Sequence, residues 1–297
     1  MRRRIFSVDS SRARGGRPPY ARGMGELIPL FPLGTPLFPG VVLPLQIFEP
    51  RYRRLMHDLL ALPEAGDRRF FGVVAIRQGW EVEHVAPAGA LYDIGCTARV
   101  QAVRHQPDGG FRVVTVGGER FRLLDVVVSD DPPYLRAEVE WLFEEEEAED
   151  AAGNHDAIAE PPGLVVPGLP DPKLEEVLAS VASASMGVLS RNVRDLFARY
   201  VAEVGELDSG GGGEPTVDPE TAVLLHAVTG DPRALSYLVA SAALLTTEDR
   251  QALLAESATR RRLAAESRLL RRELTLLQTL GAVPVPLGQF ATPMTVN

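Results

Sequence analysis

A run of acidic residues followed by prolines divides this chain into two parts of different character. Residues 144–160 hold eight acids and no base, and four prolines follow before residue 171. Like charges repel one another, and so polar a segment cannot bury enough apolar surface to offset the entropy lost on ordering. Residues 144–170 are therefore predicted to be an acidic, proline-rich linker between two folded parts.

The part before the linker, residues 25–143, has the pattern of a β domain. Residues 70–77 form a short apolar, β-branched run, and residues 135–143 alternate between apolar and polar side chains. Asp108-Gly109 lies between strand-like runs at 97–105 and 111–116, and it predicts a hairpin because glycine takes the positive φ of a tight turn. Residues 121–128 are predicted to form a further strand.

One helix is expected within this β-rich part. Pro50 suits a first helical turn, and the sequence after it gathers large side chains on one face. Those side chains are Tyr52, Leu55, Met56, Leu59 and Leu60. Five to seven short strands and one helix predict a small, partly closed β-barrel.

The part after the linker, residues 171–281, is predicted to be a helical bundle. Asp-Pro pairs at 171–172, 218–219 and 231–232 repeat one helix-start signal, an N-cap residue followed by proline. A separate helix is expected over residues 193–204. Thr247 is expected to open one long helix that reaches about Leu280, with the arginines at 260–262, 268, 271 and 272 outside its apolar stripe. The fold class is thus α+β, ending in an irregular tail at 282–297.

Composition bears on the partners of the chain and on the cellular compartment in which it is expected. A net charge of −9 gives no field that favours nucleic acid, and no apolar run reaches the roughly 20 residues that span a bilayer. The single cysteine excludes an internal disulfide, which fits a cytoplasmic protein. Residues 1–24 carry seven arginines without an apolar core. They are expected to be a disordered basic leader, an overextended start with Met24 as the initiator, or a basic arm for a partner.

Residue types needed for several kinds of catalysis are missing from the sequence. Lys173 is the only lysine, and no glycine-rich approach precedes it, so neither an ATP-binding phosphate loop nor a Ser-Lys dyad is expected. The five histidines are scattered and match no metal-ligand spacing. Cys96 leads into a strand and is interpreted as a small buried apolar residue. We therefore expect no enzyme activity, no cofactor and no metal, and Cys96 is the one nucleophile left to an enzymatic alternative.

The opening of the β-rich part resembles a known family. Residues 28–49 read IPLFPLGTPLFPGVVLPLQIFE, a proline-punctuated pattern that is similar to the start of the Lon protease N-terminal domain. The likeness continues through residues 107–124 to a closing strand at 134–141, and the late leucine and arginine pattern at 253–274 is similar to the family's helical subdomain. The Lon-like domain of cereblon is also similar.

The resemblance implies a PUA-like barrel followed by a helical bundle, in a stand-alone Lon-domain protein that lacks the ATPase and peptidase parts. In Lon proteases this region is implicated in capturing unfolded or tagged substrates and in holding the hexamer together. The implied partners are unfolded or tagged polypeptide, or a protease or chaperone. The alternatives are a PUA-like nucleic-acid-binding protein and a small-molecule or peptide-binding adaptor for a separate protease.

The family motif contains candidate binding residues and candidate structural ones. Large apolar side chains close together in sequence form a candidate peptide-binding patch, made of Phe31, Leu33, Phe38, Phe48 and Tyr52. Three prolines, Pro32, Pro39 and Pro44, are expected to hold extended segments and to block strand addition at an edge. Glu49 with Arg51, or Glu119 with Arg120, is expected to form an ion pair.

Overall fold

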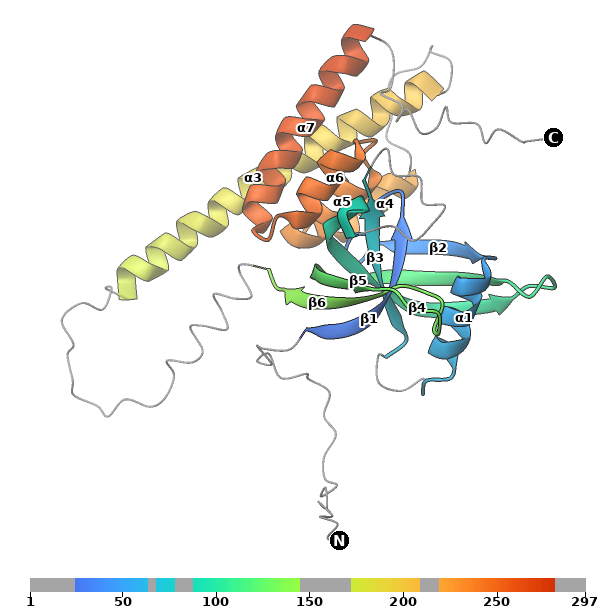
Figure 1. Cartoon of the computed structure of the whole chain (residues 1–297). Coiled ribbons are helices and arrows are strands. Elements are labelled where there is room, and N and C mark those ends of the chain that lie inside the picture. Colours follow the sequence, from blue (N-terminus) through green and yellow to red (C-terminus); the bar gives the residue numbers. More distant parts are fainter. Residues whose placement is uncertain (1–24, 64–67, 78–87, 145–171, 209–218, 281–297) are drawn as a thin grey trace, which may run out of the picture.

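The computed structural model describes residues 25–63, 68–77, 88–144, 172–208 and 219–280, with strands before residue 144 and long helices after it (Figure 1). The strands are β1 (Glu26–Leu33), β2 (Val42–Ile47), β3 (Phe70–Ile76), β4 (Leu91–His105), β5 (Phe111–Val127) and β6 (Arg136–Leu142). The helices are α1 (Pro50–Leu60), the short 3₁₀ turn η1 (Ala88–Ala90), α3 (Pro172–Asp208), α4 (Pro219–Ala227), α5 (Pro232–Ala242), α6 (Thr247–Ala255) and α7 (Thr259–Leu280). The class is α+β, as predicted. The predicted leader, most of the predicted linker and the predicted tail lie outside the described residues.

The six strands form one mixed sheet whose pairings close into a ring. The order is β2-β5-β4-β3-β1-β6, and β5 also pairs with β6. This extra pairing closes the five strands from β5 to β6 into a ring, and β2 lies outside it. β5 serves two neighbours in turn, since its residues 111–116 pair with β2 and its residues 120–127 pair with β6. β2 is left as an edge strand, and Pro44 lies in it, where proline removes one backbone donor from the edge.

The prediction of two separate strands at 111–116 and 121–128 is wrong, because one strand, β5, spans both ranges. β5 runs without a break through Gly117. A Cβ at Gly117 would collide with the backbone carbonyl of Phe38, so only glycine allows this close approach. The predicted turn at Asp108-Gly109 is confirmed, and Gly109 has a φ of +78°.

The sheet and the helices share one apolar core. α1 buries Tyr52, Leu55, Met56 and Leu59, four of the five residues predicted to lie on its apolar face. The same buried cluster continues into α3, α5, α6 and α7, so apolar packing joins the two parts of the chain. A second, smaller cluster forms around Phe121 between the strands.

The helices differ from the prediction in two places. Residues 193–204 belong to α3, a single helix of 37 residues that begins at Pro172. The expected long helix from Thr247 to Leu280 is instead two helices, α6 and α7, with a break at residues 256–258. α7 runs alongside α3, and together they extend away from the sheet (Figure 1). No helix among the described residues is long and apolar enough to cross a membrane.

Candidate functional site

The predicted peptide-binding patch does not form one exposed surface. Phe31, Phe38 and Tyr52 are buried in the core, where the Phe31 and Tyr52 rings stack with centroids 4.0 Å apart. Leu33 is half-buried against the same cluster. Phe48 is 66% exposed and is the one member of the set that faces solvent. Apolar character alone did not distinguish core residues from surface residues in this proline-rich opening.

Cys96 is buried, as predicted. Its side chain has no exposed surface, and burial raises the pKa of the thiol to about 12. A thiol with so high a pKa holds its proton at neutral pH, and the thiolate is the nucleophilic form. Cys96 is therefore unsuited to nucleophilic chemistry. Among the described residues, no group of three His, Cys, Asp or Glu side chains is placed to hold a metal ion.

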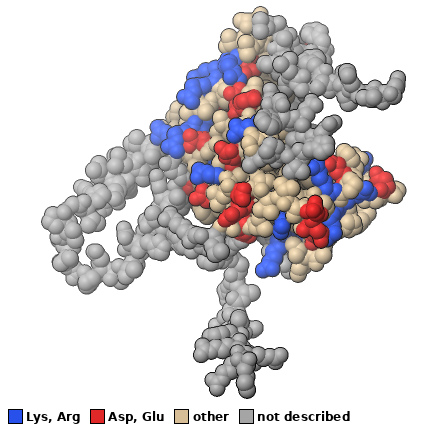
Figure 2. All heavy atoms as spheres, viewed as in Figure 1, with Lys and Arg blue, Asp and Glu red and all other residues tan. Residues whose placement is uncertain are grey.

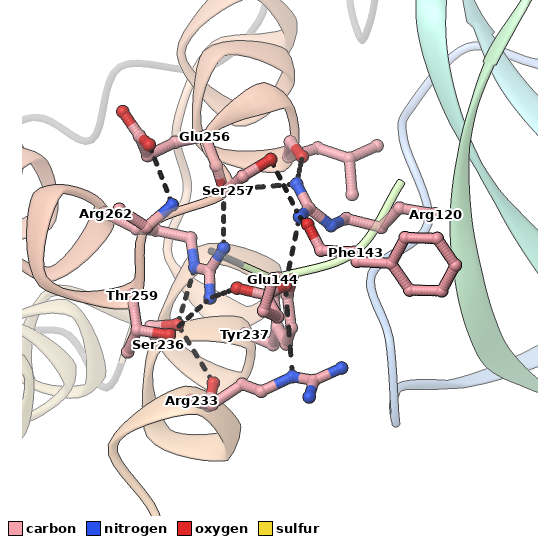
Figure 3. Close-up of polar contacts among 12 residues, drawn as sticks. Arg120, Phe143, Glu144, Arg233, Ser236, Tyr237, Glu256, Ser257, Thr259 and Arg262 are labelled. Atoms are coloured by element: carbon pink, nitrogen blue, oxygen red, sulfur yellow. Dashed lines mark hydrogen bonds and ion pairs between the residues drawn. The ribbon is translucent and has the colours of Figure 1, made fainter. Parts of the chain in front are cut away.

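A buried cluster of charges lies where the strands meet the helices (Figure 3). At its centre is Glu144, just past the end of β6, whose side chain is only 2% exposed. Its carboxylate is 3.1 Å from Arg120 of β5 and 3.1 Å from Arg262 of α7, and it accepts a hydrogen bond from Tyr237 of α5. Arg233 approaches it at 3.9 Å from the exposed side. One carboxylate thus joins a strand to two helices.

Three sequence-based expectations are wrong at this cluster. The sequence places Glu144 in the acidic linker and Arg262 outside the apolar stripe of the long helix, yet both are buried. Arg120 was a candidate partner for Glu119, but it pairs with Glu144 instead. The expected Glu49–Arg51 ion pair is present at 2.8 Å. The buried pairs link residues more than 20 positions apart, so no local pattern pointed to them.

The two buried arginines also account for the break between α6 and α7. Arg120 donates to the carbonyls of Leu254 and Glu256 at 2.8 and 3.1 Å, and Arg262 donates to the Glu256 carbonyl at 2.6 Å. Carbonyls at a helix end need donors from outside the helix. Guanidinium groups supply them here, so the helix ends at Ala255 without a glycine or a proline. The cluster is best explained as structural, because it holds the strands and the helices together.

Two concave surfaces lined by described residues are candidates for binding. A cleft of about 310 Å³ lies beside β4 and the end of α1, and its lining contains arginine and histidine but no carboxylate. A groove of about 280 Å³ lies among α3, α4 and α5, and its lining is mainly apolar. Leu224 and Leu244 of this groove are 53% and 39% exposed. Of the two surfaces, the groove is the more apolar.

The visible surface carries mixed charge. On the face drawn in Figure 2, acidic side chains lie among the basic ones over helices and strands alike. Nucleic-acid-binding surfaces gather basic side chains in a patch or stripe. This face does not have that organisation.

Comparison with known proteins shows the family of the chain. The model of the ATP-dependent protease La (LON) substrate-binding domain matches residues 27–272. The chain therefore belongs to the Lon substrate-binding domain family. The match covers both the strands and the helices.

Lon protease 1 of Herpetosiphon aurantiacus is 28% identical over 254 residues, which are 85% of this chain and 24% of that protein. Lon protease of Flavobacterium johnsoniae is 34% identical over 119 residues, which are 40% of this chain and 14% of that protein. A crystal structure of a Lon N-terminal domain protein from Xanthomonas campestris is 21% identical, with a TM-score of 0.46, and covers 83% of this chain and 98% of that one. The chain thus spans less than a quarter of the length of these two Lon proteases.

Proposed function

We propose that this chain is a non-catalytic polypeptide-recognition module, which binds exposed segments of other proteins and leaves them chemically unchanged. The observation that carries the proposal is the family match over residues 27–272, because that family is named for substrate binding. The two concave surfaces support it, since each offers a recess beside exposed apolar or backbone groups. The buried thiol of Cys96 supports the non-catalytic part.

The proposal is tested by adding the full chain to fluorescently labelled, carboxymethylated lactalbumin, a protein that stays unfolded. We expect the anisotropy to rise to saturation, with the labelled protein intact on a gel afterwards. Folded lactalbumin is the matched control and is expected not to bind. An anisotropy that stays flat, or a client that is cleaved, would show that the proposal is wrong.

A binding experiment with nucleic acid distinguishes this proposal from the main alternative, a nucleic-acid-binding protein. A labelled single-stranded oligonucleotide at low salt is expected to give no saturable signal, because the visible charges are mixed and the net charge is −9. Saturable, salt-sensitive binding of the oligonucleotide together with no binding of unfolded protein would favour a nucleic-acid reader instead.

A further inference from the structure

Strand β4 extends past its neighbour β3 and leaves part of one edge open. The β3–β4 pairing ends at Phe70 and Arg99, and one more hydrogen bond follows, from the Val100 amide to the Arg69 carbonyl at 2.9 Å. From Ala102 to His105, β4 pairs with β5 alone within the described part of the chain, and Gln101 lies at a shift in that register. An open edge of this kind is the template to which an extended segment can add.

The hydrogen-bond pattern shows which backbone groups the open edge offers. The hairpin closes with the Gln106 amide donating to the Gly110 carbonyl at 2.9 Å. Bonded and non-bonded pairs alternate along an antiparallel ladder, so Arg104 and Ala102 bond to β5. The amides of Val103 and His105 and the carbonyl of Val103 are then directed to the open edge. No described residue bonds to these three groups.

The open edge borders the 310 Å³ cleft. Leu60, at the end of α1, and Val103 give the cleft an apolar wall. Arg69 lines the same cleft and is tied to the end of α1, because its guanidinium donates to the carbonyls of Leu60 and Leu62 at 3.3 and 2.8 Å. The cleft therefore lies next to the unbonded backbone groups of β4.

Two arginines make the outer face beside this edge positively charged. Arg104 and Arg112 lie directly opposite each other on β4 and β5, and both are exposed. Like charges directly opposite on neighbouring strands destabilise a sheet. No described carboxylate pairs with either of them, so the repulsion is not offset within the described part of the chain. An acidic side chain placed beside Arg104 would offset the repulsion between the two arginines.

We propose that residues 101–105 of β4 accept an extended client segment as an added strand, with acidic side chains beside Arg104 and apolar ones beside Val103 and Leu60. Side chains alternate between the two faces of a strand, so the fitting segment alternates acidic and apolar residues. Backbone bonding at the edge gives affinity, and the alternation gives selectivity. The described lining of the cleft holds no Phe, Tyr or Trp ring for base stacking, and the His105 ring packs against Phe111, which favours polypeptide over single-stranded nucleic acid. The inference rests on the proposed function and names the client class.

The test uses the full chain and a labelled peptide of about eight residues that alternates glutamate and valine, the length of an ordinary strand. We expect saturable binding of this peptide and weak binding of a lysine and valine version. Arg104→Glu is expected to weaken the glutamate peptide about fivefold and to strengthen the lysine peptide. Arg268→Glu makes the same change of charge on an exposed position of α7 and is expected to change neither affinity. Equal effects of the two variants overturn the proposal.

A second peptide tests the backbone bonds without altering the protein. Methylation of alternate amide nitrogens removes the donors needed for strand addition and is expected to weaken binding about tenfold. Unchanged binding overturns strand addition, as does equal displacement of the peptide by single-stranded DNA. If carboxymethylated lactalbumin binds and the glutamate peptide does not, the inference is wrong and the proposed function stands. If neither binds, both are wrong.

Discussion

Replacing Glu144 by glutamine tests whether one buried carboxylate holds the strands and helices together. Glu144, Arg120 and Arg262 are each at most 2% exposed, and both guanidinium groups lie 3.1 Å from the carboxylate. Glu144→Gln removes the negative charge and leaves two buried cations without a counter-ion. Breaking a buried ion pair from one side costs about 3–5 kcal/mol, and we expect a loss of stability in that range.

The assay is urea denaturation followed by circular dichroism, with the free energy of unfolding compared between variants. Glu140→Gln is the matched control, because Glu140 pairs with Arg122 at 2.9 Å while both side chains are 53% exposed. An exposed pair contributes at most about 1 kcal/mol. If the two substitutions lower the free energy of unfolding equally, burial does not make the Glu144 cluster important and the reasoning fails.

Three further predictions follow from burial. Phe38→Ala is expected to cost about 3–5 kcal/mol in the free energy of unfolding, and Phe48→Ala less than about 0.5 kcal/mol, because only Phe38 is buried; thermal denaturation that shows equal losses would contradict this. Because burial raises the pKa of Cys96 to about 12, the thiol is expected to react with a disulfide reagent at neutral pH only after unfolding, and rapid reaction of the native protein would refute the assignment. Burial also raises the pKa of Glu266 well above its ordinary 4.5, so the folded state keeps a proton that the unfolded state releases, and stability falls as pH rises from 4.5 towards the folded-state pKa. Glu266→Gln is expected to remove this fall in pH-dependent urea denaturation, and an unchanged slope would count against a raised pKa.

Local sequence signals predicted local structure well. Asp231 was expected to cap a helix, and its carboxylate accepts a hydrogen bond from the Ala234 amide at 2.9 Å. The glycine of Asp108-Gly109 turns the chain between β4 and β5, as its conformational freedom suggested. Such signals work because the interacting groups lie within a few residues of one another.

Features that depend on distant residues were not predictable in the same way. Glu144 reads as one more acid in an acidic run, and its burial depends on Arg262, which lies 118 positions later. The break between α6 and α7 depends on Arg120, a residue of β5. The apolar residues of the proline-rich opening gave no sign of which ones the helices would cover. The open edge of β4 likewise depends on where β3 stops pairing, and so on the arrangement of the whole sheet.

Hydrogen exchange of the full chain, with and without carboxymethylated lactalbumin, reports both whether polypeptide binds and where it binds. The client is expected to slow amide exchange at residues 101–105 of β4, where the amides of Val103 and His105 have no partner among the described residues. Exchange that is unchanged throughout the chain at a saturating client concentration would contradict the claim that this chain recognises polypeptide. Slowing confined to other segments would contradict the site assigned to it.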